Sequence, residues 1–156
     1  FDTEVPQFWR DDLWKVIKET PSLDWLLLTK RAAEMRQIVG QMGCPPNAWL
    51  GVSVEDQQRA DERIHILRSM TEAKVRFLSA EPLLEEVRLN LDGIDWVIVG
   101  GETGADAREM AAPWARSIKN QCLIAGVRFF MKQMTNREEI PPDLLLREFP
   151  LDGARS

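Results

Sequence analysis

Short apolar runs recur along this chain and are separated by longer stretches of mixed polarity. A strand with one solvated face alternates polar and apolar residues, whereas a strand buried on both faces is apolar throughout. The runs therefore predict strands of a parallel sheet that is covered on both faces. The five predicted strands cover about 25–28, 48–54, 74–79, 95–99 and 127–131.

The stretches between these runs carry apolar residues at helical spacing and have breakers at their ends. Proline is favoured in the first turn of a helix and glycine just after the last, which places the final long helix between Pro113 and Gly126. The segment 83–93 is too irregular to assign. The other predicted helices cover about 6–18, 32–41 and 56–69, with one short helical turn near 143–146.

Alternating strands and helices with right-handed connections form either an open α/β sheet or a barrel. The predicted strand ends are about 25 residues apart, which suits a TIM-type barrel, where ~250 residues make eight βα units. Five strands do not close such a barrel. The sequence therefore predicts one α/β domain over residues 1–156, a partial (βα) TIM-type barrel of about five parallel strands with flanking helices.

A small residue followed two positions later by glutamate occurs at three of the predicted strand ends. Side chains two positions apart share a face of a strand, so each glutamate has open space beneath it. Parallel α/β folds bind ligands at the carboxyl ends of their strands, which makes these positions candidate site residues. The three pairs are Ser53 with Glu55, Ser79 with Glu81, and Gly100 with Glu102.

Two lysines extend this pattern, because Lys30 and Lys132 stand at the ends of the first and last predicted strands. Parallel strands bring their carboxyl ends to one rim, so three carboxylates and two ammonium groups are expected around a shared cleft. No residue is assigned to a metal. We predict a cofactor-binding role for Lys30 and catalytic roles for Glu55, Glu81, Glu102 and Lys132.

Several chemistries suit such a group, and the sequence leaves them open. Carboxylates bind hard cations such as Mg²⁺. A carboxyl group whose pKa is raised by like-charged neighbours acts as a general acid or base, and a desolvated lysine acts as a nucleophile. The alternative is structural: the same side chains form a ring of compensating salt bridges at the barrel mouth.

The segment 100–104 is a glycine-rich turn after a strand, where backbone amides can approach an anion. It lacks the Gly-Lys-Ser/Thr ending of a P-loop. Arg108 either faces the same site or is an ordinary solvated loop arginine. The further predicted cofactor-binding residues are Ser53, Ser79, Gly100, Gly101 and Arg108.

Composition limits the class of protein. The 156 residues are 44% hydrophobic and 29% charged, as in soluble globular domains. No apolar run approaches the ~18 residues of a membrane span, and no signal peptide is present, so a cytoplasmic location without membrane contact is expected. The net charge of −5 does not favour nucleic-acid binding. Cys44 and Cys122 lack metal-type spacing and are expected to be reduced thiols.

The start of the chain is acidic and has no initiator methionine, which indicates a fragment that lacks an N-terminal region. The first predicted helix carries Trp9 and Trp14. We expect these two side chains to form a surface that the missing region covers, or through which the chain associates with itself.

Five motifs, in order, resemble the phage gene-product thirty-seven/sixty-eight family, and the resemblance covers nearly the whole chain. The endings at 140–144 and 147–150 are also similar to that family. The motifs are LTKR at 28–31, WLGVSVE at 49–55, FLSAEPL at 77–83, DWVIVGGE at 95–102 and FFMKQ at 129–133.

The resemblance implies a setting for the chain. The family is found in phages, prophages and bacteria, and its biochemical function is largely unassigned. Complete members resemble radical-SAM proteins, with a cysteine cluster that holds an iron–sulfur centre and a partial TIM barrel. The resemblance thus implies SAM and an iron–sulfur cluster in the complete protein and no cofactor in this chain. The Gly-Gly-Glu at 100–102 is similar to a SAM-contacting motif.

Three interpretations follow. The favoured one is the C-terminal part of a radical-SAM-like enzyme with a strand-end site, acting on an unknown small-molecule or macromolecular substrate and inactive as a fragment. The second is a barrel enzyme that uses carboxylates and lysine, with a divalent metal in one version. The third is a non-catalytic phage–host interaction module.

Overall fold

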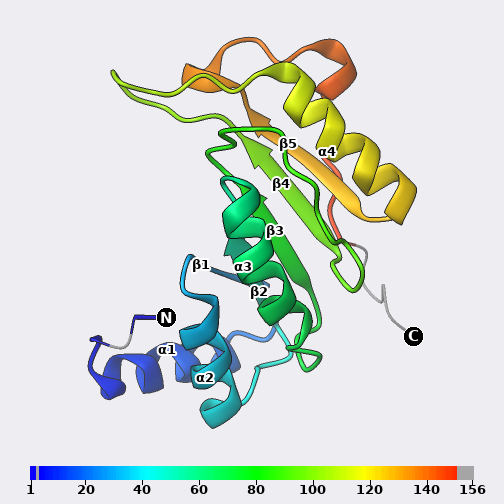
Figure 1. The fold of residues 1–156 in the computed structure, drawn as a ribbon. Helices are drawn as coiled ribbons and strands as arrows, with labels where there is room; N and C mark the ends of the chain where they lie inside the picture. The colour runs from blue at the N-terminus through cyan, green and yellow to red at the C-terminus, as the bar shows by residue number, and fades with distance from the viewer. Residues whose placement is uncertain (3, 151–156) are drawn as a thin grey trace.

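The computed structural model describes residues 1, 2 and 4–150. Within them, five strands and four helices follow one another in the predicted order (Figure 1). The strands are β1 (Trp25–Thr29), β2 (Ala48–Ser53), β3 (Arg76–Ala80), β4 (Trp96–Gly100) and β5 (Arg128–Gln133). The helices are α1 (Gln7–Glu19), α2 (Ala32–Met42), α3 (Gln57–Arg68) and α4 (Ala112–Ala125), followed by the short 3₁₀ turns η1 (Thr135–Arg137) and η2 (Pro142–Leu144).

The five strands are parallel, and each pairs with the next one along the chain, in the order β1-β2-β3-β4-β5. Helices α2, α3 and α4 lie on one face of the twisted sheet (Figure 1). The predicted class is confirmed as a mixed α/β fold whose parallel sheet is flanked by helices, consistent with a partial βα barrel. Because consecutive strands are neighbours, their carboxyl ends follow one another along a single edge.

Local chemistry explains where the helices begin and end. The side chain of Asp56 accepts a hydrogen bond from the Arg59 amide at 2.7 Å and so caps the start of α3. Pro113 lies in the first turn of α4, and Gly126 ends that helix with a left-handed φ of 69°. The predicted positions of proline and glycine around this helix are therefore confirmed.

The helical turn predicted near 143–146 is wrong in its bounds. The turn starts at Pro142, whose fixed φ suits a first helical position, and ends at Leu144. Leu146 cannot continue it because its carbonyl oxygen accepts a hydrogen bond from the Met131 amide of β5, at 2.8 Å. The end of the described chain thus runs along the outer edge of β5.

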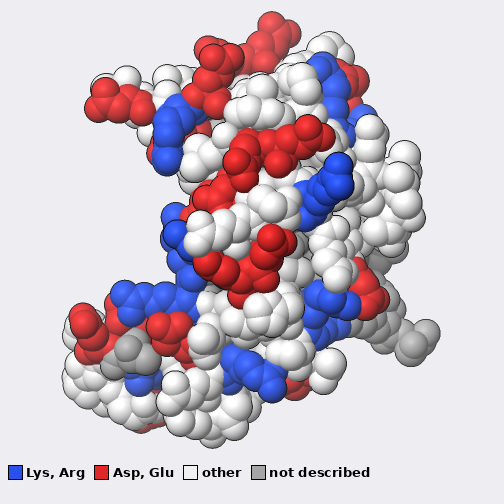
Figure 2. All heavy atoms as spheres, in the orientation of Figure 1, with Lys and Arg blue, Asp and Glu red and all other residues white. Residues whose placement is uncertain are grey.

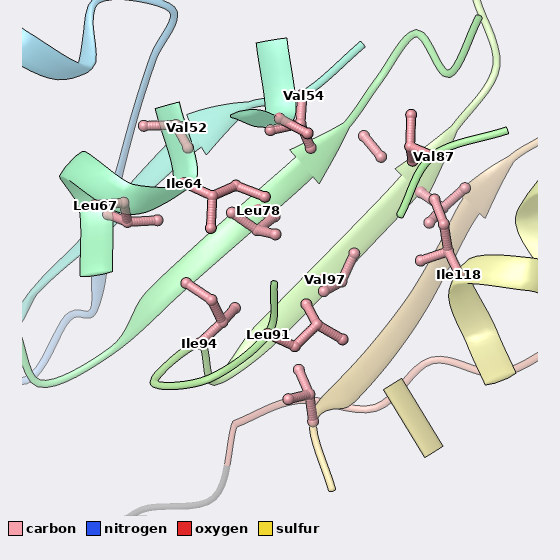
Figure 3. Close-up of a cluster of buried hydrophobic side chains, with 14 of the residues drawn as sticks. Val52, Val54, Ile64, Leu67, Leu78, Val87, Leu91, Ile94, Val97 and Ile118 are labelled. Atoms are coloured by element: carbon pink, nitrogen blue, oxygen red, sulfur yellow. The ribbon is translucent and has the colours of Figure 1, made fainter. Parts of the chain in front are cut away.

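The main core lies between the sheet and the helices. The connection from β3 to β4 contains no helix, yet its side chains cover the sheet as a helix would. Figure 3 shows part of this cover, with Leu91 and Ile94 close to Val97 of β4. The irregular segment predicted at 83–93 is therefore a packing element. The apolar side chains that it and its flanks bury are Leu83, Val87, Leu91 and Ile94.

The face of the sheet turned away from α2, α3 and α4 carries a smaller apolar cluster, which we call the inner face. Its largest side chains pack against one another across strands: the rings of Trp49 and Trp96 meet edge to face, with centroids 6.1 Å apart. The ring of Phe77 lies over Gly51, so closely that no Cβ fits there. The inner face comprises Trp49, Val75, Phe77, Trp96, Ile98 and Phe130.

Trp14 does not lie on the surface that the sequence predicts for it. Its side chain is 4% exposed, its ring meets that of Phe1 at 6.1 Å, and its indole nitrogen donates to the Gly43 carbonyl oxygen at 2.9 Å. Five positions along a helix turn through about 140°. Trp9 is therefore on the other side of α1, where it is exposed beside Phe8.

Among the described residues, no helix is both long and apolar enough to cross a membrane.

Candidate functional site

The carboxyl ends of the strands meet along the edge toward which the arrows of β4 and β5 point in Figure 1. The molecular surface is hollowed on this side, and acidic and basic side chains gather around the hollow (Figure 2). The predicted rim residues all lie within two positions of a strand end. They are Lys30, Glu55, Glu81, Glu102 and Lys132.

Glu55 is the most buried carboxylate of this edge, with 9% of its side chain exposed. It forms an ion pair with Lys30 and a second one with Arg63 Nη1 at 2.9 Å. Arg63 also donates to the Ser53 carbonyl oxygen at 2.8 Å, which fixes the guanidinium under the strand end. Burial opposes ionisation of Glu55, but the hydrogen bond from Lys30 and the charge of Arg63 outweigh it, so the pKa of Glu55 is lowered.

Glu81 is paired with Lys132 across β3, β4 and β5. The lysine Nζ lies 2.8 Å and 2.9 Å from the two carboxylate oxygens. The Glu81 side chain passes directly over Gly100, where an added Cβ would meet its carboxyl carbon at 3.0 Å. The small residue at position 100 therefore makes room for this ion pair.

Glu102 accepts three hydrogen bonds from Arg108. The donors are the Arg108 amide at 2.9 Å and its Nε and Nη2 atoms, each at 2.8 Å. These bonds lower the pKa of Glu102 to about 2. The carboxylate stays ionised at neutral pH and acts as an acceptor and a charge rather than as a general acid. Arg108 therefore lies beside Glu102 at this edge, and its cofactor-binding role stays a prediction.

Gly101 is enclosed by the chain itself. An added Cβ would come within 3.0 Å of the backbone of Met134 and Thr135. The Gly101 amide donates to the Gln133 carbonyl oxygen at 3.0 Å, and the Gln133 side chain donates back to the Gly101 carbonyl oxygen at 2.9 Å. The two glycines of the Gly-Gly-Glu sequence are therefore explained by packing within the chain.

Thr135 anchors the loop that leads away from Glu102. Its hydroxyl oxygen accepts a hydrogen bond from the Met110 amide at 2.8 Å, and the residue is only 6% exposed. The two residues after it, Asn136 and Arg137, have left-handed φ values of 51° and 61°. Such strain in residues other than glycine persists only where surrounding contacts impose it. The sequence gives no signal for this anchor.

The predicted serines lie lower on the inner face than the charged groups. Ser53 and Ser79 are 4% and 3% exposed and are paired in register between β2 and β3. Because a serine side chain is small, Ser53 and Ser79 leave space on the inner face beneath Glu55 and Glu81. A direct contact between either serine and a cofactor stays a prediction.

Arg63 is the rim residue that the sequence did not identify. It lies inside α3, where charged residues at the solvent face are ordinary, and only its distance of two helical turns from Glu55 is suggestive. With it, the edge holds four cations for three carboxylates. The Lys30–Glu55 and Arg108–Glu102 pairs influence each other, since the charge of Lys30 also contributes to the lowered pKa of Glu102. Among these seven side chains the positive charges outnumber the negative ones by one.

The two cysteines, Cys44 and Cys122, are poorly suited to bind a metal. Burial raises the pKa of the Cys44 thiol to about 11 and that of the Cys122 thiol to about 12. Both are free thiols. Within the described part of the chain, no three His, Cys, Asp or Glu side chains gather as a metal site would require.

A search of curated proteins and a search of solved structures found no match to this chain. A family model does match, over residues 1–142. The five strands and the rim residues of this chain lie within that range, so the match includes the whole candidate site. The chain belongs to the family described as "Protein of unknown function (DUF5131)".

Proposed function

We propose that this chain is the ligand-binding half of a radical-SAM-like barrel enzyme, and that its ligand lies in the hollow at the carboxyl edge of the sheet. The observation that carries the proposal is the set of ion pairs at that edge. Lys30, Arg108 and Lys132 have side chains that are 61%, 59% and 51% exposed. Each of these side chains can exchange its glutamate partner for a ligand with little loss of free energy, because its charged group is solvated.

Structural salt bridges alone explain this arrangement less well. The Arg108–Glu102 and Lys132–Glu81 pairs are partly exposed. Such pairs contribute little to stability, so folding alone accounts weakly for two of them at one hollow. Parallel α/β folds place ligands at this edge because helices and loops there converge on the strand ends. In our proposal the lysines and Arg108 hold a ligand carboxylate or phosphate, and Glu81 and Glu102 accept hydrogen bonds from ligand amino groups.

The implied cofactors fit this chain unequally. An iron–sulfur cluster does not fit, because Cys44 and Cys122 are separate thiols with raised pKa values. The amino-acid end of SAM does fit: its carboxylate suits Lys30 or Arg108, and its ammonium group suits Glu102, which remains ionised. When bound with an iron–sulfur cluster, SAM would supply radical chemistry.

The test uses the complete protein, expressed anaerobically with iron and sulfide. We expect iron uptake, and SAM cleavage when dithionite is the reductant. Glu102→Gln should weaken SAM binding about tenfold in calorimetry, the effect of losing a charged hydrogen bond. Glu62→Gln is the matched control, because Glu62 also pairs with an arginine but lies on the outer side of α3. Absence of both iron and SAM cleavage would contradict the proposal.

A second candidate, a non-catalytic interaction module, is favoured by the outer side of α1. Phe8 and Trp9 are 60% and 58% exposed, and Leu13 and Val16 continue the same apolar surface. Large exposed apolar patches mark interaction sites in soluble proteins. Self-association through α1 would then use Trp9 and its neighbours, without the buried Trp14.

This candidate predicts a dimer whose population rises with protein concentration in sedimentation experiments. Trp9→Ser should shift the protein to the monomer, because it removes the largest exposed apolar side chain of α1. Leu123→Ser is the control, since Leu123 is 78% exposed on α4, away from this surface. A wild-type monomer at all concentrations, or an equal effect of both variants, counts against it.

A further inference from the structure

The end of the described chain adds a short antiparallel segment to the outer edge of β5. The Leu146 carbonyl oxygen accepts a hydrogen bond from the β5 backbone at 2.8 Å, and the Glu148 amide donates one to it at 2.9 Å. Between these bonds, Arg147 lies directly opposite Phe130. Opposite residues of an antiparallel pair share a face of the sheet, and so do residues two positions apart on one strand. Arg147 and Phe149 therefore extend the inner face beyond Phe130.

Arg147 is an exposed cation at this end of the inner face. Its Nε and Nη2 atoms donate long hydrogen bonds to the carbonyl oxygens of Met131 and Lys132, at 3.3 Å and 3.4 Å. Its Cζ atom lies 5.7 Å from the centroid of the Phe130 ring. Within the described part of the chain the guanidinium thus contacts uncharged groups, whereas Arg108 is paired with a glutamate. Its charge is therefore oriented beside the end of β5 and is available to an anion.

Phe149 places an accessible aromatic ring next to this cation. Its side chain is 59% exposed, and its ring meets those of Phe130 and Trp96, with centroids 5.3 Å and 5.6 Å apart. The two inner rings support Phe149 from below and leave its outer side open to another ring, which would pack on it stacked or edge to face. Because Arg147 and Phe149 are two positions apart, the aromatic and cationic groups start about 7 Å from each other.

We infer that this end of the inner face binds an aromatic carboxylate whose ring and carboxyl group are joined by a short aliphatic linker. The ring packs on Phe149, and the carboxylate accepts charge-assisted hydrogen bonds from the free side of the Arg147 guanidinium. Lys132, two positions beyond Phe130 on the same face and 51% exposed, supplies a second cation. This inference rests on the proposed location of the ligand at the carboxyl edge, and it names the class of substrate rather than the site of SAM.

The test compares three probes in NMR titrations: phenylpropionate, the uncharged phenylpropionamide, and propionate, which has no ring. Phenylpropionate should bind about tenfold more tightly than either of the others, the effect of one charged hydrogen bond or one buried ring. Arg147→Met should remove the preference over the amide, and Phe149→Ser the preference over propionate. Arg116→Met and Phe8→Ser are the matched controls, because Arg116 pairs with Asp143 beside α4 and Phe8 is 60% exposed on α1.

A measurement on the wild-type protein guards against variants that fail to fold. Nuclear Overhauser effects should connect the ring protons of bound phenylpropionate with those of Phe149 and not with those of Phe8. Equal binding of the three probes, or no such effect to Phe149 at saturation, overturns the inference. Phenylpropionate binding without iron uptake or SAM cleavage in the complete protein refutes only the radical-SAM proposal. SAM cleavage without phenylpropionate binding refutes only the inference.

Discussion

Gly51→Ala is expected to lower the free energy of unfolding by about 3 kcal/mol, the upper range for overpacking a tight core. An added Cβ would come within 3.0 Å of three atoms of the Phe77 ring. That ring is 1% exposed and contacts Trp96, so it has no free space into which to move. Urea denaturation followed by circular dichroism measures the change.

Gly40→Ala is the matched control for this prediction. Gly40 lies within α2, and an added Cβ there meets nothing within 4 Å. Alanine is the better helix former by about 1 kcal/mol, so this variant should be as stable as the wild type or more stable. Equal free energies of unfolding for Gly51→Ala and Gly40→Ala would contradict the close packing of the Phe77 ring over Gly51. Trp fluorescence should also shift in Gly51→Ala, because Trp49 and Trp96 lie in the disturbed cluster.

The fold could be predicted largely from the sequence because its central strands are buried on both faces, whereas the predicted cover of both faces is wrong for the edge strand β1, in which Leu26 and Leu28 are about half exposed. The β2 and β3 strands are buried at every position, and each appears in the sequence as a short, mainly apolar run without alternation. The exception is the segment between β3 and β4. Its buried residues Leu83, Val87 and Leu91 are four apart and yet no helix forms. Their partners are the sheet and α4, which only the tertiary structure reveals.

The positions of the candidate site were predictable, but its pairings were not. Strand ends in a parallel sheet must meet at one edge, which places Glu55, Glu81 and Glu102 together whatever their partners are. The partners come from elsewhere: Arg63 from inside α3 and Arg108 from a loop. Likewise, the sequence suggested that Gly101 approaches a ligand, whereas the backbone of η1 occupies that space. Distant contacts of this kind leave no local pattern.

The ion pairs of Glu55 have a consequence for stability that can be measured. Both Glu55 and Arg63 are largely buried, with side chains 9% and 12% exposed. Arg63→Met leaves the buried Glu55 carboxylate with the more exposed Lys30 as its ion-pair partner, so this variant should cost about 2 kcal/mol. The double variant Glu55→Met/Arg63→Met removes both charges and should recover most of that loss. Arg59→Met, one helical turn earlier and paired with the exposed Glu62, should leave the free energy of unfolding nearly unchanged.

The same pair predicts how stability depends on pH. The pKa of Glu55 is lower in the folded protein than in the unfolded chain. The contribution of Glu55 to the free energy of unfolding is therefore complete above the pKa of the unfolded chain, about 4.3. It is lost as the pH falls through the folded pKa. The free energy of unfolding of the wild type should therefore decrease between neutral pH and the acid range more steeply than that of the double variant. Parallel curves for the two proteins would show that Glu55 gains no stabilisation from Lys30 and Arg63, because an ionised and a protonated carboxyl group would then be equally favourable at this edge.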